Sequence, residues 1–266
     1  MRSVVYLLAA GVLCATGALR AETKQERGKR VVDEALAAIG GEKYLAMTDR
    51  VESGRAYSFY RDQLTGLSVA KIYTRYLNAP AASGLAVRER QSFGKDEDYY
   101  VLFTDAGGYV ITFRGARPMP KDRYTRWSDS TRRNILYILR HRLKEPGLIF
   151  ESQGTTVWQN TPVEIVDVTD ADNNVVTVFF QMSNKLPVRQ VFVRRDPITK
   201  ERFEEVSVFA KYRDVGGGVQ WPYNITAFRN GGKVYEIFSD DVKINTGLSD
   251  NQFTLSTNMK VLPPEK

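Results

Sequence analysis

Near the start of this sequence, hydrophobic residues recur at helical spacing. Over residues 24–39 the apolar positions fall on one side of a helix and the charged positions fall on the other. Gly40 and Gly41 follow at once, and glycine commonly lies just past the end of a helix. The pattern predicts an amphipathic helix over residues 24–39, followed by a short helical piece over residues 42–47.

The spacing then changes to a period of two, which is typical of β-strands. Segments rich in Tyr, Phe, Val and Ile are separated by short Gly, Asn, Asp or Pro breaks. The predicted strands are residues 51–60, 67–77, 85–93, 98–104, 108–114, 148–158, 162–169, 174–182, 187–195, 202–213, 219–229 and 233–245. Roughly a dozen strands at this spacing, with hairpin signals at residues 105–108 and 230–232, predict a mainly β chain folded as an antiparallel sheet or barrel. No linker interrupts the series, so we expect one domain over residues 22–266.

One helical segment interrupts the strands in the middle of the chain. Residues 128–144 carry an apolar face with basic residues opposite, and Pro146 and Gly147 end the pattern. His141 falls at the polar margin of this helix, which predicts that it faces solvent. A basic amphipathic helix either packs on its own protein or rests on an anionic membrane surface, and the pattern leaves both open.

Some of the predicted strands are apolar on both faces. In residues 174–182, Val175 and Phe179 occupy one face, while Val176 and Phe180 occupy the other. A sheet with one face in water alternates apolar and polar residues instead. We therefore expect both faces to be covered, whether by helices, by a second layer or by an apolar ligand.

The beginning of the chain has the order of a secretory signal peptide. Arg2 precedes a short apolar run over residues 4–13, and small residues follow as far as Ala21. The run is shorter than the roughly 20 apolar residues that span a bilayer. We predict a signal peptide over residues 1–21, cleaved near Ala21 with Ala18 as the alternative, and a periplasmic location for the mature chain.

The composition argues against disulfides, cysteine and histidine metal sites and nucleic-acid binding. Its 266 residues include one cysteine, Cys14, and one histidine, His141. An intramolecular disulfide is therefore excluded, and a metal site built from cysteine and histidine is not expected. The net charge of +7 is not gathered into a recognisable nucleic-acid-binding module, so we expect no nucleic-acid partner.

Signatures of catalysis are absent from the sequence. It contains no G-x-S-x-G, P-loop or H-E-x-x-H pattern. His141 lies between two arginines with no evident carboxylate partner for a triad. Adjacent carboxylates such as Glu204 and Glu205 point to opposite faces of a strand and make a poor acid–base pair. We expect no catalytic residues, no cofactor and no metal; a hydrolase that uses these carboxylates is the enzymatic alternative.

Several segments together resemble the periplasmic lipoprotein-carrier superfamily, the LolA/LolB-like outer membrane lipoprotein-sorting proteins. They are ALAAIGGEKYLAM, DAGGYVITFRG, KLPVRQVFVRR, VSVFAKYRDVGGGVQWPYNITAFRNGGKVYEI and INTGLSDNQFTL, in this order along nearly the whole mature chain. The resemblance implies a strongly curved antiparallel sheet that forms an unclosed barrel, with helices across its concave face. It also implies an apolar cavity for acyl chains between the sheet and the helices.

Alternation in the strands and helical spacing predict which residues could line such a cavity. They do not determine which of the two alternating sets of strand residues faces inward. The strand candidates are Tyr57, Phe59, Val69, Tyr73, Tyr109, Ile111 and Phe113, and the helix contributes Ile135, Leu136, Leu139 and Leu143 as a lid. Arg132 and Arg142 fall inside the apolar arc of the helix, where a guanidinium can meet a phosphate or carboxylate headgroup. The alternatives are a packed core for the apolar residues and a solvated pair for the arginines.

We interpret the chain as a monomeric, non-catalytic protein that carries or senses a lipid or lipoprotein acyl chain in the periplasm, with transient contact to the membrane surface. An acyl chain in water exposes apolar area worth ~25 cal/mol per Å², which an apolar cavity recovers without directional polar groups. The alternative is an envelope protein-interaction or stress-sensing module that transfers no lipid.

Overall fold

The computed structural model describes residues 21–80, 84–105, 107–196 and 199–264. Apart from Ala21, the predicted signal peptide lies outside these residues. Helix α1 (Lys24–Ile39) has the predicted bounds. A capping box begins it: the Glu26 N–H donates to Thr23 Oγ1 at 3.1 Å, and the Thr23 N–H donates to the Glu26 carboxylate at 2.8 Å. Gly40, at φ 131°, ends this helix, and α2 (Gly41–Leu45) follows.

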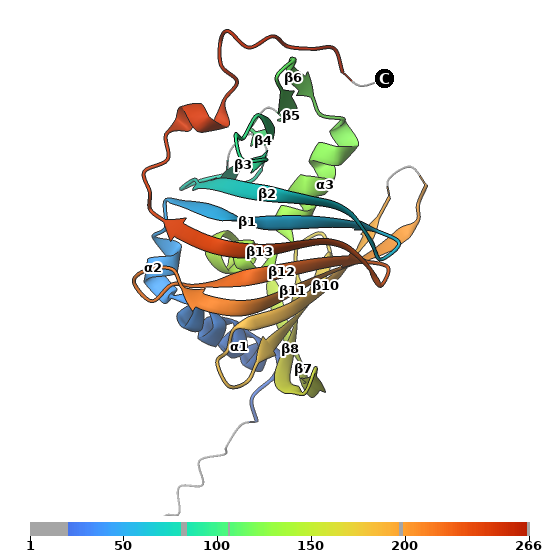
Figure 1. Cartoon of the computed structure of the whole chain (residues 1–266). Helices are drawn as coiled ribbons and strands as arrows, with labels where there is room; N and C mark the ends of the chain where they lie inside the picture. The colour runs from blue at the N-terminus through green and yellow to red at the C-terminus, as the bar shows by residue number, and fades with distance from the viewer. Residues whose placement is uncertain (1–20, 81–83, 106, 197–198, 265–266) are drawn as a thin grey trace, which may run out of the picture.

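Within the described residues, thirteen strands form one antiparallel sheet that is not closed into a barrel (Figure 1). The strands are β1 (Asp49–Tyr60), β2 (Gln63–Tyr76), β3 (Val87–Phe93), β4 (Tyr99–Thr104), β5 (Gly107–Thr112), β6 (Gly115–Pro118), β7 (Ile149–Trp158), β8 (Thr161–Thr169), β9 (Val175–Gln181), β10 (Pro187–Arg195), β11 (Arg202–Asp214), β12 (Gln220–Arg229) and β13 (Gly232–Ile244). Their order is β6-β5-β4-β3-β2-β1-β13-β12-β11-β10-β9-β8-β7, so β6 and β7 are the two edges. Every predicted strand is present, and β6 is the one that the pattern does not predict.

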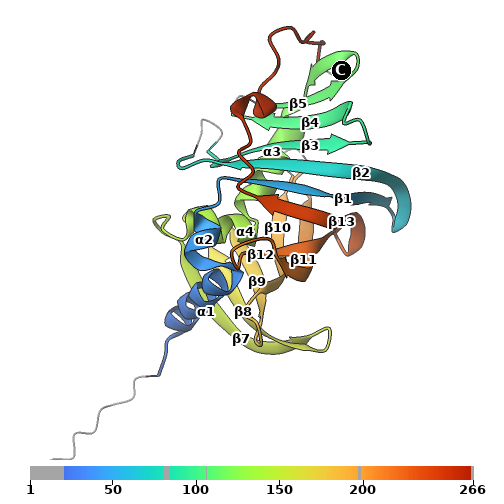
Figure 2. The ribbon, with the colours of Figure 1, turned by 60° about the vertical axis from the view of Figure 1, so that its left-hand side comes forward.

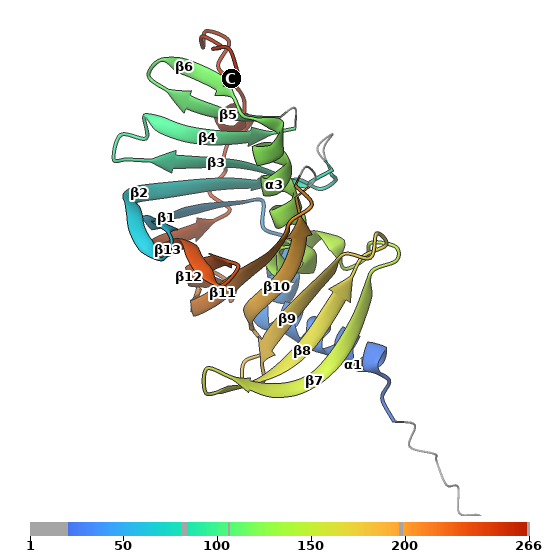
Figure 3. The same cartoon turned by 90° about the vertical axis from the view of Figure 1, so that its right-hand side faces the viewer.

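The chain crosses from the β6 edge to the β7 edge by a helical segment on the inner side of the curved sheet (Figure 3). It consists of α3 (Lys121–Arg132), α4 (Ile135–Tyr137) and the π-helix η1 (Ile138–Arg142). The prediction of one continuous helix over residues 128–144 was wrong. Asn134 has extended backbone, at φ −70° and ψ 128°, and its side-chain oxygen accepts from the Leu136 N–H at 2.8 Å. This cap starts a new helical turn and breaks the segment in two.

The face of the sheet that meets the helices, called the inner face below, carries the main core. Val166 and Val178 are paired across β8 and β9, so they share this face, and they are buried together with α1 and Leu139 of η1. At the other end of the sheet, Phe103 of β4 stacks on Trp127 of α3 with ring centroids 4.1 Å apart. Figure 2 shows the sheet curving around the helices.

The opposite, outer face is covered only in part by the described residues. Val175 on β9 and Val193 on β10 remain 43% and 52% exposed. The Arg189 guanidinium lies 4.7 Å from the centre of the Phe179 ring. The expectation that both faces of these strands are covered was therefore wrong for the outer face.

The C-terminal segment after β13 packs on part of the outer face of β1–β6 (Figure 2). Leu248, together with Phe253 of the 3-10 helix η2 (Asp250–Phe253), packs against Leu102 and Ile111. Further on, the Ala116 N–H donates to the Lys260 carbonyl at 2.9 Å. The segment therefore both buries part of the outer face and pairs with the short edge strand β6.

Asp49, at the start of β1, holds the C-terminal segment in place. Its buried carboxylate accepts hydrogen bonds from the backbone N–H groups of Thr246 at 2.7 Å, Gly247 at 2.9 Å and Leu248 at 3.3 Å. Burial raises the pKa of Asp49, but these hydrogen bonds together lower it by more, so the pKa lies below its usual range.

Asp49→Ala should lower the free energy of unfolding by about 2–3 kcal/mol, because the charge-assisted hydrogen bonds are lost. Since the folded pKa is depressed, this stabilisation is complete above the unfolded pKa of about 4 and is lost as the pH falls through the folded pKa. Urea unfolding near neutral pH and near pH 3 measures the free energy of unfolding of both proteins. The difference between wild type and Asp49→Ala should be smaller at the acidic pH. Asp250→Ala, at an exposed position of η2, is the matched control; equal losses for both variants would contradict this role.

Candidate functional site

The helices leave a space on the inner face that the described side chains do not fill. It has a volume of about 150 Å³ and lies between β1, β2, β3 and β12 on one side and the α3–α4 junction on the other. We call it the inner hollow. Its lining consists of Tyr44, Arg50, Thr74, Tyr76, Val87, Glu89, Thr131, Asn134, Leu136, Tyr137, Trp221 and Ile225. The lining is mixed, with charged and polar residues beside aromatic and aliphatic ones.

Arg50 is the cation of the inner hollow. Strand β1 places it on the inner face, opposite Thr74 of β2, and it is buried. Its guanidinium donates to Thr74 Oγ1 at 3.1 Å and to the Tyr76 hydroxyl at 3.4 Å, and it lies 3.9 Å from the centre of the Trp221 ring. The Glu52 carboxylate is 3.5 Å from Arg50 Nε. Burial lowers the pKa of Arg50, but Tyr76 and the nearby carboxylates raise it by more, so Arg50 stays charged.

Glu89 joins the sheet to α3 within the same hollow. Strand β3 places it opposite Thr74, and its Oε1 accepts hydrogen bonds from Gln91 Nε2 at 2.6 Å and from the Trp127 indole at 3.3 Å. Burial raises the pKa of Glu89 above its ordinary value, and these hydrogen bonds and the charge of Arg50 only partly offset this effect. The carboxyl therefore takes up a proton at a higher pH than an exposed glutamate does.

Trp221 contributes a donor that has no partner in the described part of the chain. Only 3% of this residue is exposed, and no described residue accepts a hydrogen bond from its Nε1–H. Buried polar groups in proteins are almost always hydrogen-bonded, so a donor of this kind marks a place where an acceptor fits.

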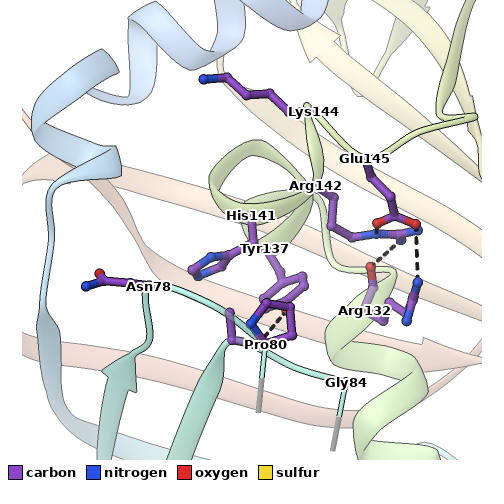
Figure 4. Close-up of a pocket in the computed structure, with 10 residues that line it drawn as sticks. Asn78, Pro80, Gly84, Arg132, Tyr137, His141, Arg142, Lys144 and Glu145 are labelled. Atoms are coloured by element: carbon purple, nitrogen blue, oxygen red, sulfur yellow. Dashed lines mark hydrogen bonds and ion pairs between the residues drawn. The ribbon is translucent and has the colours of Figure 1, made fainter. Parts of the chain in front are cut away.

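A second space, which we call the outer pocket, lies beside the inner hollow and shares Tyr137 with it (Figure 4). It measures about 440 Å³, and its lining consists of Asn78, Pro80, Gly84, Ala86, Arg132, Tyr137, His141, Arg142, Lys144 and Glu145. The Tyr137 hydroxyl accepts a hydrogen bond from the Ala86 N–H at 2.8 Å. That bond ties α4 to the chain just before β3 and fixes the wall between the two spaces.

Both predicted headgroup arginines line the outer pocket, and both bind Glu145 (Figure 4). Buried Arg142 donates to Glu145 at 2.6 and 2.9 Å, to the Arg132 carbonyl at 2.8 Å and to Asp170 at 3.3 Å. Arg132 lies 3.2 Å from Glu145, but its side chain stays 44% exposed. Of the two, only Arg132 has the exposure to meet a ligand without breaking a buried network.

His141 does not face solvent as the helical pattern predicts. It is half-buried in the wall of the outer pocket, with its ring centroid 4.9 Å from that of Tyr137. Burial, together with the charge of Arg140, lowers the pKa of His141 to about 4. The pattern fails here because the π-helix turns its residues away from the positions of a regular α-helix.

The predicted helix residues lie between the sheet and the helices, where they were expected. Ile135 and Leu139 are fully buried in the main core, and Leu143 packs against that core. Leu136 is the member of this group that lines the inner hollow. Whether these residues contact a ligand stays a prediction.

The predicted strand residues lie on the outer face, away from the helices. Tyr57, Phe59, Val69, Tyr73, Tyr109, Ile111 and Phe113 alternate with the inner-facing residues of β1, β2 and β5 or follow them at a turn. Tyr73, Tyr109 and Ile111 pack in the cluster under the C-terminal segment, whereas Phe113 is 86% exposed. The structure therefore does not bring the strand and helix candidates together around one cavity.

The residues that do line the inner hollow from the sheet were not predicted. Charged and polar residues such as Arg50, Thr74 and Glu89 lie on the inner face of β1–β3, and in the sequence they look like the solvent side of these strands. Trp221 precedes Pro222, which only marks the segment as part of a turn and strand. In the structure Arg50 is paired with Thr74, and Thr74 is paired with Glu89, so the three residues share one face. The sequence alone does not show this pairing.

Solved structures with the same architecture span most of this chain. A domain named for outer membrane lipoprotein sorting, from Vibrio parahaemolyticus, matches with a TM-score of 0.57 and 12% identity, covering 86% of this chain and 97% of that one. A DUF1329 family protein from Desulfovibrio piger matches with a TM-score of 0.58 and 13% identity, covering 85% and 97%. A LolA superfamily protein from Nitrosomonas europaea matches with a TM-score of 0.51 and 11% identity, covering 85% of this chain and 97% of that one.

This chain has a LolA/LolB-like fold. The resemblance noted in the sequence, and the unclosed, curved antiparallel sheet that it implies, are confirmed at the level of the fold. The sequence matches no family model and none of the curated proteins.

Two further observations concern the described residues alone. None of the helices there is both long enough and apolar enough to cross a membrane. The same residues contain no group of three or more His, Cys, Asp and Glu side chains placed to hold a metal ion.

The single histidine gives a direct test of the site geometry. The imidazole of His141 should titrate with a pKa of about 4, because burial and Arg140 disfavour its charged form. Since the folded pKa is lowered, its contribution to stability is complete above the unfolded value of about 6.5 and is lost as the pH falls toward the folded pKa. An NMR pH titration of the untagged mature chain follows one imidazole signal; a midpoint near 6.5 would place His141 in solvent instead.

Proposed function

We propose that this chain is an exported, non-catalytic binding protein that takes up the acyl chain of a lipid or lipoprotein between its curved sheet and the α3–η1 segment. The observation that carries the proposal is the inner hollow, because protein interiors are normally packed without such spaces. The aliphatic part of its lining, Val87, Leu136 and Ile225, suits methylene groups. The likeness in fold to a lipoprotein-sorting domain and to a LolA superfamily protein supports the same function.

A whole acyl chain needs more room than the inner hollow offers at rest. Ligand pockets commonly measure about 300–1,000 Å³, against about 150 Å³ here. Uptake therefore requires α3 to move away from the sheet. None of the side chains of α3 is buried, and its apolar contacts to the sheet are those of Tyr124 and Trp127.

The energies favour such an opening when a long chain enters. An aromatic pair such as Phe103 and Trp127 contributes about 0.5–1.5 kcal/mol beyond its buried area. Each methylene of the ligand that is buried contributes ~0.8 kcal/mol of favourable binding free energy. Several buried methylenes therefore offset the contacts that α3 gives up.

The outer pocket suits the polar end of the same ligand. Arg132 and Lys144 stand at its rim, and Arg132 keeps an exposed guanidinium. These cations can meet an anionic headgroup or an anionic membrane surface. The predicted signal peptide supports a periplasmic location for this function.

A second candidate function is that of an envelope protein-interaction module. It is favoured by the outer face of β9 and β10, where Val175 and Val193 are exposed beside Arg195 and Arg202. This surface would dock another protein without any lipid. Native pull-down from envelope extracts should then recover a stoichiometric protein partner, and organic extraction of the purified chain should recover no lipid.

Native purification followed by solvent extraction and mass spectrometry tests the first candidate. We expect a lipid in stoichiometric amount, or uptake of a fluorescent fatty acid by chain that was purified empty. Preparations that stay empty and take up no fluorescent fatty acid would contradict the proposal.

Filling the inner hollow should block uptake. Val87→Phe places an aromatic ring in the lining of the inner hollow, and we expect it to weaken the binding of a fluorescent fatty acid by about tenfold or more. Val193→Phe makes the same substitution on the outer face and should leave binding unchanged. Thermal unfolding of both variants checks that they are folded, and Ile225→Phe is a second filling variant. Equal binding by the filled and control variants would argue against the inner hollow as the site.

A further inference from the structure

The polar groups in the lining of the inner hollow indicate which part of a lipid it recognises. We propose that the hollow holds the neutral carbonyl oxygen of an esterified acyl group, with the indole N–H of Trp221 as the donor and the Arg50 guanidinium beside it. This inference rests on the proposed function and makes it more specific, because it assigns a chemical group to the site.

The first argument is that two residues of the lining, Arg50 and Trp221, each carry a buried donor without a hydrogen-bond partner among the described residues. Trp221 Nε1 is buried without an acceptor among the described residues, and so is Arg50 Nε, which lies 3.5 Å from Glu52 without a hydrogen bond. The Arg50 guanidinium stacks on the Trp221 ring at 3.9 Å, so the two side chains form one unit. An oxygen that lies against this unit removes the cost of a buried donor left unsatisfied.

The second argument is the balance of charge around the donors. Arg50 is already paired with Glu52, and Glu52 also accepts a hydrogen bond from Ser239. Glu89 adds a second carboxyl to the lining. A ligand carboxylate or phosphate would meet these acidic groups at close range, whereas a carbonyl oxygen accepts the same hydrogen bond without a net charge. The site therefore favours a neutral acceptor.

The third argument is size. A water molecule occupies about 30 Å³ in the liquid, so a hollow of about 150 Å³ holds a group of a few heavy atoms. An ester linkage with its first methylenes has this size. Leu136 and Ile225 belong to the same lining as Arg50 and Trp221, and the first methylenes would contact them. The rest of the chain follows once α3 moves.

Two matched ligands isolate the carbonyl. Monodecanoylglycerol and decylglycerol ether have the same chain and headgroup and differ only in the ester carbonyl. For wild type we expect the ester to bind about tenfold more tightly than the ether in a calorimetric or displacement titration, which is the change given by one buried hydrogen bond. Decanoate should bind more weakly than the ester at neutral pH because of its charge.

Trp221→Phe removes the donor and keeps an aromatic ring. It should reduce the preference for the ester to near unity by weakening the ester alone, while the affinity for the ether changes less than about twofold. Trp158→Phe, at the end of β7 outside the hollow, is the control and should keep the wild-type preference. An unchanged preference in Trp221→Phe, or a preference for decanoate, would overturn the inference.

If Trp221→Phe does not fold, NMR of the wild-type protein can detect the hydrogen bond to the ligand carbonyl. The chain has three tryptophans, so the indole N–H signal of Trp221 can be assigned and followed in the wild-type protein. It should move downfield on addition of the ester and stay in place on addition of the ether. Binding of both ligands with no such movement would overturn the carbonyl site and leave the proposed function standing. Binding of neither ligand would overturn both.

Discussion

A sheet of thirteen strands has more inner face than the helices among the described residues cover, and the proposed function depends on this mismatch. Helix α1 and η1 close the part of the face over β7–β12 with a continuous apolar core. At the other end, α3 covers β3–β5 through a few aromatic contacts and buries none of its own residues. Between these two ends the inner hollow remains, so an unfilled space follows from the architecture itself.

The part of the inner face that the helices leave uncovered carries polar residues. Where helices pack on the sheet, valines and phenylalanines fill the interface. Where they do not, Arg50 is paired with Glu52, and Glu89 accepts hydrogen bonds from Gln91 and Trp127. Buried charges of this kind are costly unless paired, and a purely apolar wall would lack directional groups altogether. This hollow therefore combines an aliphatic side for methylenes with a polar side that can orient a linkage group. That combination separates it from a cavity that selects for apolar volume alone.

Much of the fold could be predicted from the sequence because it is encoded locally. The apolar spacing over residues 24–39, the glycines at 40 and 41 and the Asn230-Gly231-Gly232 turn act over a few residues, and each predicted a feature that the structure contains. The break at Asn134 was missed because the apolar spacing continues across it while a single side-chain cap interrupts the backbone. The C-terminal segment was missed because its placement depends on Asp49, which is about two hundred residues away in the sequence.

The site was harder to predict, for a physical reason. In β1 and β2 aromatic residues such as Tyr57 and Tyr73 alternate with Arg50 and Thr74, and alternation alone assigns the aromatic side to the interior. The structure places the charged side inward, because the C-terminal segment covers part of the aromatic face and hydrogen bonds between strands satisfy the polar one. Tyr73, for example, lies on the outer face with its hydroxyl on Glu97 at 2.9 Å. Only contacts between distant segments decide such a case.

Uptake of a whole acyl chain requires α3 to move away from the sheet, and a distance between spin labels measures this movement. The one cysteine, Cys14, lies in the predicted signal peptide, so spin labels can be placed on the mature chain at Arg123→Cys in α3 and Asn230→Cys in the β12–β13 turn. Lys29→Cys in α1, paired with Asn230→Cys, gives the reference. On binding of monodecanoylglycerol the α3 distance should lengthen while the α1 distance stays constant. Bound lipid with both distances unchanged would show that α3 does not move when the lipid enters.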